Sequence, residues 1–298
     1  SSSSSIRHQR MKRPRGSNEV PVVLRQLVMY VGQATKDVLK LPRPLSPPVV
    51  KLETRVDAEY GLPSTHAMAA TAISFTVLLS APARMQFQFE VGLLIALTLS
   101  SLVCLSRLYT GMHSVLDVLC GVLLSALLLF LTFPYWEAFD RLQLSSAASP
   151  AAAPALLLLL SYTYPDAARY STTRGDTTTI LGAGAGCSVG YWVNERLGRT
   201  FEPRGPLPAP LPALTAAALA RGAARFLVGA AALLGTRQAA KAASLRALYA
   251  WYGVRGGDRA AAARRREIEV PYKFFTYAAV GLVNSVLVNR GFVLLGLL

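Results

Sequence analysis

Hydrophobic residues along this chain gather in long runs separated by short polar stretches, rather than recurring periodically to form one apolar face. A helix needs about 20 apolar residues, within a range of about 17–25, to cross the hydrocarbon layer of a membrane. The runs predict seven or eight membrane segments, several of them short, at residues 22–34, 67–79, 91–105, 115–133, 151–164, 180–193, 211–234 and 274–298. The expected fold class is therefore all-α, a polytopic transmembrane helix bundle.

Composition agrees with that class. The 298 residues are 52% hydrophobic and only 16% charged, which is too apolar for a disordered protein. The formal charge is +15, but the basic residues are divided among loops rather than placed on one face, so no nucleic-acid partner is expected. The three cysteines are too far apart for a Cys-x-x-Cys zinc site: Cys104, Cys120 and Cys187.

The chain divides into a basic, serine-rich tail at 1–20, expected to be disordered, and a membrane domain at 21–298. Within that domain we expect a catalytic core at about 21–195 and further membrane helices at 206–298. Four glycines predict close helix packing: Gly182, Gly184, Gly186 and Gly190. The basic segment 237–266 is expected to be a cytoplasmic loop on the opposite side from the polar clusters described next, although the seven spans counted before it conflict with that placement.

Three polar clusters lie between the first four spans, and topology predicts that they meet. Spans 67–79 and 91–105 form a hairpin, so its two open ends, His66 and Ser106, must lie at the same membrane face. The first span ends at that face too, because one loop joins it to His66. Residues far apart in sequence therefore converge at one interface.

His113 and Asp117 are four residues apart at the start of a predicted helix, so they share a face. A carboxylate bonded to one imidazole nitrogen leaves the other as a lone-pair donor, as a nucleophilic histidine requires. Placing an acidic side chain such as Asp117 inside an apolar span also costs free energy, which suggests that the residue has a function. The alternative is that Asp117 favours the helix dipole and His113 is an interfacial residue.

Cations suited to phosphate are expected at the same face. Arg43 and Arg107 suit bidentate binding, whereas Lys36 acts as a point charge. Pro42 and Pro44 predict that the first helix ends before Arg43, which then folds back. Other basic residues nearby are expected to contact anionic lipid headgroups: Lys40, Lys51 and Arg55.

The stretch Pro63-Ser64-Thr65-His66 predicts a loop entering a helix. Ser64 or Thr65 is a suitable N-cap, and the free N–H groups of the helix start attract an anion. His66 is then placed to act as a general acid on a leaving group. The alternative is ordinary capping with an interfacial histidine. Taken together, the clusters predict metal-independent hydrolysis of a phosphate ester, with no cofactor and no metal ligands.

The clusters resemble, in order, the three signature motifs of the type-2 phosphatidic acid phosphatase superfamily, which includes lipid phosphatases, glucose-6-phosphatase and vanadium haloperoxidases: Lys36-x6-Arg43-Pro44, Pro63-Ser64-Thr65-His66 and Ser106-Arg107-x5-His113-x3-Asp117. The resemblance implies a helix bundle of that kind. It implies that His113 forms a phosphohistidine, that Asp117 orients it and that His66 is the general acid. The implied phosphate cradle is Lys36, Arg43, Ser64, Thr65 and Arg107. The superfamily usually has glycine where Thr65 stands.

Within the superfamily the chain is most similar to sphingosine-1-phosphate phosphatases, in stretches 28–36, 47–53, 101–107 and 171–176. This implies a multi-pass protein of the endoplasmic reticulum membrane with a lumenal site. The implied substrates are sphingosine-1-phosphate and related phosphorylated sphingoid bases, and the remaining partners are membrane lipids. Members of that family carry more membrane sequence before the first motif, so either an N-terminal truncation or a divergent first exon is expected.

Two other hypotheses remain open at this point. One is a phosphatase of the same fold that acts on another lipid phosphate or on a polyprenyl phosphate. The other is a catalytically inactive relative that binds or transports lipid, in which Arg221, Arg225 and Arg290 would line a pathway.

Overall fold

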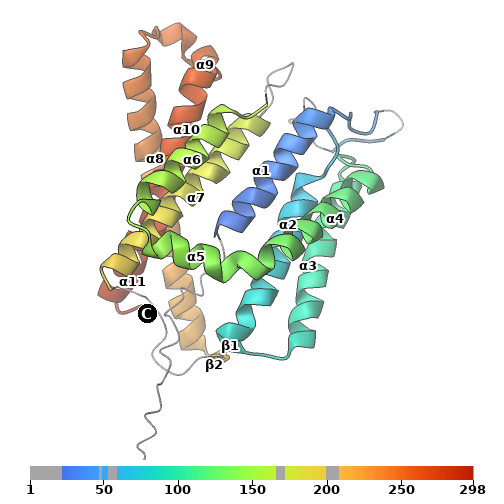
Figure 1. Ribbon diagram of the computed structural model, residues 1–298, viewed down its shortest axis with the longest axis vertical. Helices are drawn as coiled ribbons and strands as arrows, with labels where there is room; N and C mark the ends of the chain where they lie inside the picture. Colours follow the sequence, from blue (N-terminus) through green and yellow to red (C-terminus); the bar gives the residue numbers. More distant parts are fainter. Residues whose placement is uncertain (1–21, 47–48, 53–58, 166–171, 199–207, 298) are drawn as a thin grey trace, which may run out of the picture.

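A computed structural model of the chain describes residues 22–46, 49–52, 59–165, 172–198 and 208–297. The expected tail at 1–20 and Arg55 lie outside this part. Figure 1 shows a bundle of helices, and its main elements are α1 (Val22–Leu39), α2 (Thr65–Ser80), α3 (Phe89–Tyr109), α4 (Val115–Thr132), α5 (Trp136–Ser145), α6 (Ser149–Tyr162), α7 (Thr173–Arg196), α8 (Ala216–Trp251), α9 (Arg259–Ala262), α10 (Arg266–Leu282) and α11 (Asn289–Leu294).

Short elements join these helices. Three 3-10 turns occupy Ala81–Ala83, Phe133–Tyr135 and Gly256–Asp258, and a π-helix, Val283–Val288, connects α10 to α11. Two strands of two residues each, β1 (Met85–Gln86) and β2 (Ala209–Pro210), pair in parallel. The strands make up only four of the described residues, so the all-α class predicted from the hydrophobic runs is confirmed.

Within the described residues, five helical stretches are long and apolar enough to cross a membrane: Thr65–Ala83, Phe89–Tyr109, Val115–Ser145, Ala216–Trp251 and Arg266–Leu294. Many large apolar side chains on these helices point away from the protein, including Leu94, Leu102 and Phe130. In a soluble protein such exposure would be unfavourable, whereas in lipid these side chains face hydrocarbon. The chain is therefore a multi-pass membrane protein.

The first half of the bundle packs α1, α2 and α4 together around Val28, Met68, Ala72 and Leu129. The Ser125 hydroxyl on α4 donates to the Met68 carbonyl on α2 at 3.0 Å. This packing brings the C-terminal end of α1 and the N-terminal ends of α2 and α4 to the same end of the bundle (Figure 1).

The second half of the bundle packs α7 against α10, and small residues make this contact close. A Cβ added at Gly182 would lie 2.6 Å from the Phe274 carbonyl oxygen, and Gly186 faces the Ala278 backbone in the same way. The prediction that the glycines allow close helix packing is confirmed. Leu157 of α6 joins Leu181, Ala185 and Phe274 in the adjoining core.

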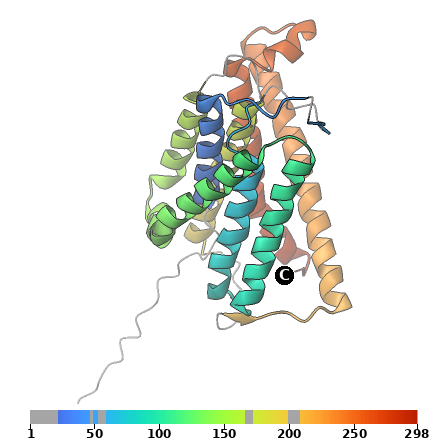
Figure 2. The same cartoon turned by 90° about the vertical axis from the view of Figure 1, so that its right-hand side faces the viewer.

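Several predicted boundaries are wrong. The segment 237–266 is not a loop, because α8 continues to Trp251 and flanks one side of the molecule (Figure 2). Residues 237–251 are rich in alanine, also include leucine, arginine and lysine, and contain neither glycine nor proline, so the helix continues until Gly253 adopts a positive φ. The last span begins at Arg266 rather than at 274, and α5 is an additional helix.

The tip joining α8 to α10 lies at the same end of the bundle as the N-terminal ends of α2 and α4 (Figure 1). Arg266 donates to the Tyr164 carbonyl at 2.8 Å, and Arg174 donates to the Arg264 carbonyl at 3.2 Å. The basic segment and the polar clusters therefore lie at the same end of the bundle, whereas the positive charge of the segment suggested opposite ends.

Candidate active site

The first motif leaves helix α1 as its prolines predict. The helix ends at Leu39, and Arg43 lies in the following loop, where it folds back. Arg43 Nη1 donates to the Met112 carbonyl at 3.2 Å, which places its guanidinium beside His113. Lys36 and Arg43 are only 1% and 8% exposed. The loop therefore joins the first motif directly to the third.

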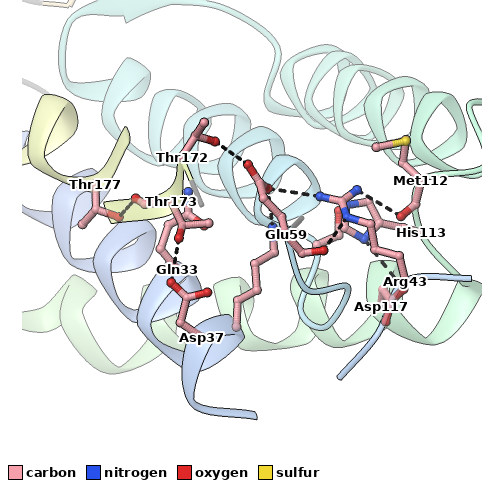
Figure 3. A network of polar contacts seen from close by, with 12 residues as sticks. Gln33, Asp37, Arg43, Glu59, Met112, His113, Asp117, Thr172, Thr173 and Thr177 are labelled. Carbon is pink, nitrogen blue, oxygen red and sulfur yellow. Dashed lines mark hydrogen bonds and ion pairs between the residues drawn. The ribbon is translucent and has the colours of Figure 1, made fainter. Parts of the chain in front are cut away.

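Glu59 holds these two cations together. Its Oε2 accepts from Lys36 Nζ at 3.3 Å and from Arg43 Nη2 at 3.1 Å, and its carbonyl accepts from Arg43 Nε at 3.0 Å. Its Oε1 accepts from the Thr172 hydroxyl at 2.7 Å. Figure 3 shows the Glu59 carboxylate lying between Thr172 and Arg43. A carboxylate thus occupies the two cations that the sequence assigns to phosphate.

The segment after Glu59 connects the first motif to the other two. Gly61 N donates to the Leu41 carbonyl at 2.8 Å. A Cβ at Gly61 would lie 3.0 Å from the Pro42 carbonyl oxygen and 3.3 Å from Asp117 Oδ2, so only glycine fits without displacing them. Ser64 N donates to the Asp117 carbonyl at 3.0 Å. The predicted convergence of the three clusters is confirmed.

The second motif starts helix α2. Ser64 is its N-cap, since the side chain accepts from Ala67 N at 3.5 Å, and Thr65 is its first residue. Both side chains are buried, whereas His66 is exposed. A buried helix start with an exposed histidine beside it can present N–H groups to an anion and a titratable ring to a leaving group.

The third motif differs in one respect from its predicted geometry. His113 precedes helix α4, whose N-cap is Ser114, so His113 and Asp117 do not share a helical face. They meet because Asp117 completes a capping box: its Oδ2 accepts from Ser114 N at 2.7 Å and lies 3.7 Å from His113 Nδ1. That separation is longer than a hydrogen bond, and Nδ1 is buried without a hydrogen-bond partner among the described residues. Asp117 therefore caps the helix and also faces the imidazole.

The electrostatic environment keeps His113 neutral. Burial is the largest cause, and the positive charges of Arg43 and Lys36 act in the same direction, so the pKa of His113 falls to about 3. A neutral imidazole has a lone pair available for attack at physiological pH. Burial alone would raise the pKa of Glu59, but Lys36, the Thr172 hydroxyl and Arg43 hold that pKa below its ordinary value.

Arg107 is the most separate of the predicted residues. It lies in the last turn of α3, is partly buried, and its Nε donates to Ser106 Oγ at 3.3 Å. Arg107, Arg43 and Lys36 all lie close enough to His66 to interact with it electrostatically. Arg107 therefore adds positive charge near His66.

Sequence reasoning missed a second polar network behind the cations. Asp37, fully buried next to Lys36, accepts at Oδ2 from the Tyr164 hydroxyl at 2.6 Å and from the Thr173 hydroxyl at 2.7 Å (Figure 3 shows Asp37 and Thr173). This network ties α1 to the start of α7. An acid inside an apolar helix is the signal that could have revealed Asp37, whereas nothing in the loop sequence distinguished Glu59.

A helix bundle with these three motifs at one end belongs to a known class of membrane phosphatase. Residues 22–141 match the PAP2 superfamily. No solved structure matches the chain.

Sphingosine-1-phosphate phosphatase 2 of Homo sapiens is 51% identical over 269 residues, which are 90% of this chain and 67% of that protein. The Mus musculus protein of the same name is 50% identical over 279 residues, 93% of this chain and 78% of that protein. Sphingosine-1-phosphate phosphatase 1 of Rattus norvegicus is 37% identical over 277 residues, 93% of this chain and 64% of that protein. The chain belongs to the PAP2 superfamily and, within it, to the sphingosine-1-phosphate phosphatase family. It is a lipid phosphate phosphatase, a phosphoric monoester hydrolase.

Proposed function

We propose that this protein hydrolyses sphingosine-1-phosphate and related phosphorylated sphingoid bases through a phosphohistidine on His113. The observation that supports the mechanism is the buried, neutral imidazole of His113, which faces Asp117. Beside it lies the guanidinium of Arg43, which donates to the carbonyl of Met112. The substrate class is supported by relatives named sphingosine-1-phosphate phosphatase and dihydrosphingosine 1-phosphate phosphatase.

In the first step, His113 Nε2 attacks phosphorus in line with the bond to the sphingoid C1 oxygen. That P–O bond breaks, and His66 donates a proton to the leaving alkoxide, so the free sphingoid base departs. Asp117 binds Nδ1–H and stabilises the positive imidazole that forms, as its position 3.7 Å away allows once the ring shifts slightly. In the second step, His66 takes a proton from water, which attacks phosphorus, breaks the P–N bond and releases inorganic phosphate.

Charge on the phosphoryl oxygens is balanced by Lys36, Arg43 and Arg107. Buried cations are effective here because the surroundings screen them weakly. Because the Ser64 N–H is bonded to the Asp117 carbonyl, Ser64 contributes its hydroxyl and Thr65 its backbone N–H at the start of α2. A backbone contact from Thr65 does not depend on the side chain that replaces the usual glycine. We propose that these groups carry out the reaction without a metal ion.

A phosphate-release assay on membranes tests the proposal. Wild-type protein is assayed with and without EDTA, and the His113→Ala variant is the control. We expect release from sphingosine-1-phosphate that EDTA does not reduce, that vanadate inhibits by mimicking the in-line transition state, and that the variant lacks. Full turnover by the variant would overturn the mechanism. Preferred release from lysophosphatidate or dolichyl diphosphate in competition would overturn the substrate class.

We propose further that the protein lies in the endoplasmic reticulum membrane with its site facing the lumen, as the family resemblance implies. The α8–α10 tip, which carries Arg264, Arg265 and Arg266, provides a test because it lies at the site's end of the bundle. The positive-inside rule alone would place that basic tip in the cytoplasm. A glycosylation acceptor inserted near Gly256 is expected to be modified, since modification occurs only in the lumen. An unmodified acceptor would overturn the orientation.

A further inference from the structure

Glu59 has no role in the reaction described above, yet it lies at the centre of the site. One carboxylate oxygen contacts Lys36 and Arg43, and the other accepts from the hydroxyl of Thr172, the residue that precedes α7. Its side chain is 11% exposed, so water screens its charge little. A second anion brought to the same cations would be repelled unless a positive charge came with it.

A phosphate monoester that binds Lys36 and Arg43 must share them with Glu59 or displace its Oε2. Phosphates of glycerolipids, such as lysophosphatidate and phosphatidate, bring only negative charge to this place. A sphingoid-base phosphate differs because its C2 carries an ammonium group next to the C1 that bears the phosphate. Its own cation therefore enters the site beside the phosphate, within reach of the released carboxylate.

We propose that Glu59 is a specificity-determining residue that binds the substrate's C2 ammonium group, with Thr172 holding the carboxylate in place. The inference rests on the proposed function. In the structure the Glu59 carboxylate is balanced by Lys36 and Arg43. In the complex with substrate, the phosphate binds these two cations and the ammonium group binds the carboxylate. With a sphingoid-base phosphate, each of these buried charges therefore keeps a partner of opposite sign. For a glycerolipid phosphate one carboxylate loses its partners, which is costly in a buried site.

The experiment removes the charge from the enzyme and from the substrate separately. Wild-type protein and Glu59→Gln are assayed with sphingosine-1-phosphate and with its N-acetyl derivative, which keeps the phosphate and the chain but has no ammonium group. The quantity measured is the ratio of the two kcat/KM values. We expect wild type to prefer the amine roughly tenfold to a hundredfold, and Glu59→Gln to bring that ratio close to one.

Controls separate this role from simple positioning of the cations. If Glu59 only oriented Lys36 and Arg43, Glu59→Gln would lower both kcat/KM values equally and leave the ratio unchanged, which would overturn the inference. Glu90→Gln, an exposed acid at the start of α3, is the matched control and should keep the wild-type ratio.

Two further variants keep the inference falsifiable if Glu59→Gln does not fold. Thr172→Val should lower the ratio, because it removes the 2.7 Å hydrogen bond that holds the carboxylate. Glu59→Asp, which keeps the charge, should retain part of the preference. Wild-type ratios in both variants would count against the role of Glu59. Absence of phosphate release from sphingosine-1-phosphate by wild type would instead contradict the proposed function.

Discussion

Gly121→Ala tests whether the packing of α2 on α4 positions the reacting groups. Gly121 lies one turn after Asp117 on α4, and a Cβ there would meet the Ser64 carbonyl oxygen at 2.7 Å. That oxygen belongs to the backbone and already accepts from Met68 N at 3.0 Å, so it cannot rotate away. The added methyl group must therefore move the start of α2 as a unit.

The size of the movement follows from the same contact. Ordinary contact begins at 3.4 Å, so the start of α2, with Ser64 and His66, must shift by about 0.7 Å relative to His113. A misplacement of about 1 Å at a reacting centre costs up to about 100-fold in rate. We therefore expect kcat/KM for phosphate release to fall roughly tenfold to a hundredfold in Gly121→Ala.

Purified protein in detergent is assayed for phosphate release and for thermal unfolding. Gly235→Ala on α8 is the matched control, because a Cβ there meets nothing within 4 Å. The control should keep wild-type activity, since the added methyl group meets no neighbouring atom and alanine favours a helix by up to about 1 kcal/mol over glycine. Wild-type activity in Gly121→Ala would refute the claim that this contact sets the distance between the second and third motifs.

Two further predictions concern pH and stability. Because the pKa of His113 lies at about 3, protonation of the nucleophile should not lower kcat/KM until the pH falls close to that value. Arg43→Gln removes a nearby positive charge and so raises the pKa of His113, which should move the acidic limb of the kcat/KM profile to higher pH. An unmoved limb would contradict the assignment of His113 as the nucleophile. Tyr164→Phe removes hydrogen bonds to Asp37 and to the Gln33 carbonyl at 2.6 and 2.9 Å. Tyr164→Phe should lower the free energy of unfolding by about 1–3 kcal/mol. An unchanged melting temperature in detergent would argue against a stabilising role of these two hydrogen bonds.

The convergence of the motifs could be predicted from sequence because it depends only on helix count and direction. Two spans joined by a short turn return to the same face, so His66 and Ser106 had to lie at the same face whatever their side chains contact. The local geometry of His113 could not be predicted in this way. It depends on where α4 begins, and the Ser114 N-cap makes Val115, two residues after the histidine, the first residue of the helix.

Contacts between distant loops were beyond sequence reasoning. Glu59 and Thr172 lie in polar loops that helices α2 to α6 separate in the sequence, and no periodicity relates them. The length of α8 was missed for a different reason. Basic residues in 237–251 indicated a loop by charge, whereas their helix propensity, together with alanine and leucine, favoured continuation of the helix.

The central claim is that His113 becomes phosphorylated during turnover. The direct measurement is rapid quenching of the enzyme with sphingosine-1-phosphate labelled in the phosphate, followed by mapping of the labelled peptide by mass spectrometry. We expect an acid-labile, base-stable phosphoryl group on the peptide that contains His113, and no such group in His113→Ala. A label on another residue, or turnover by His113→Ala without any labelled protein, would contradict it.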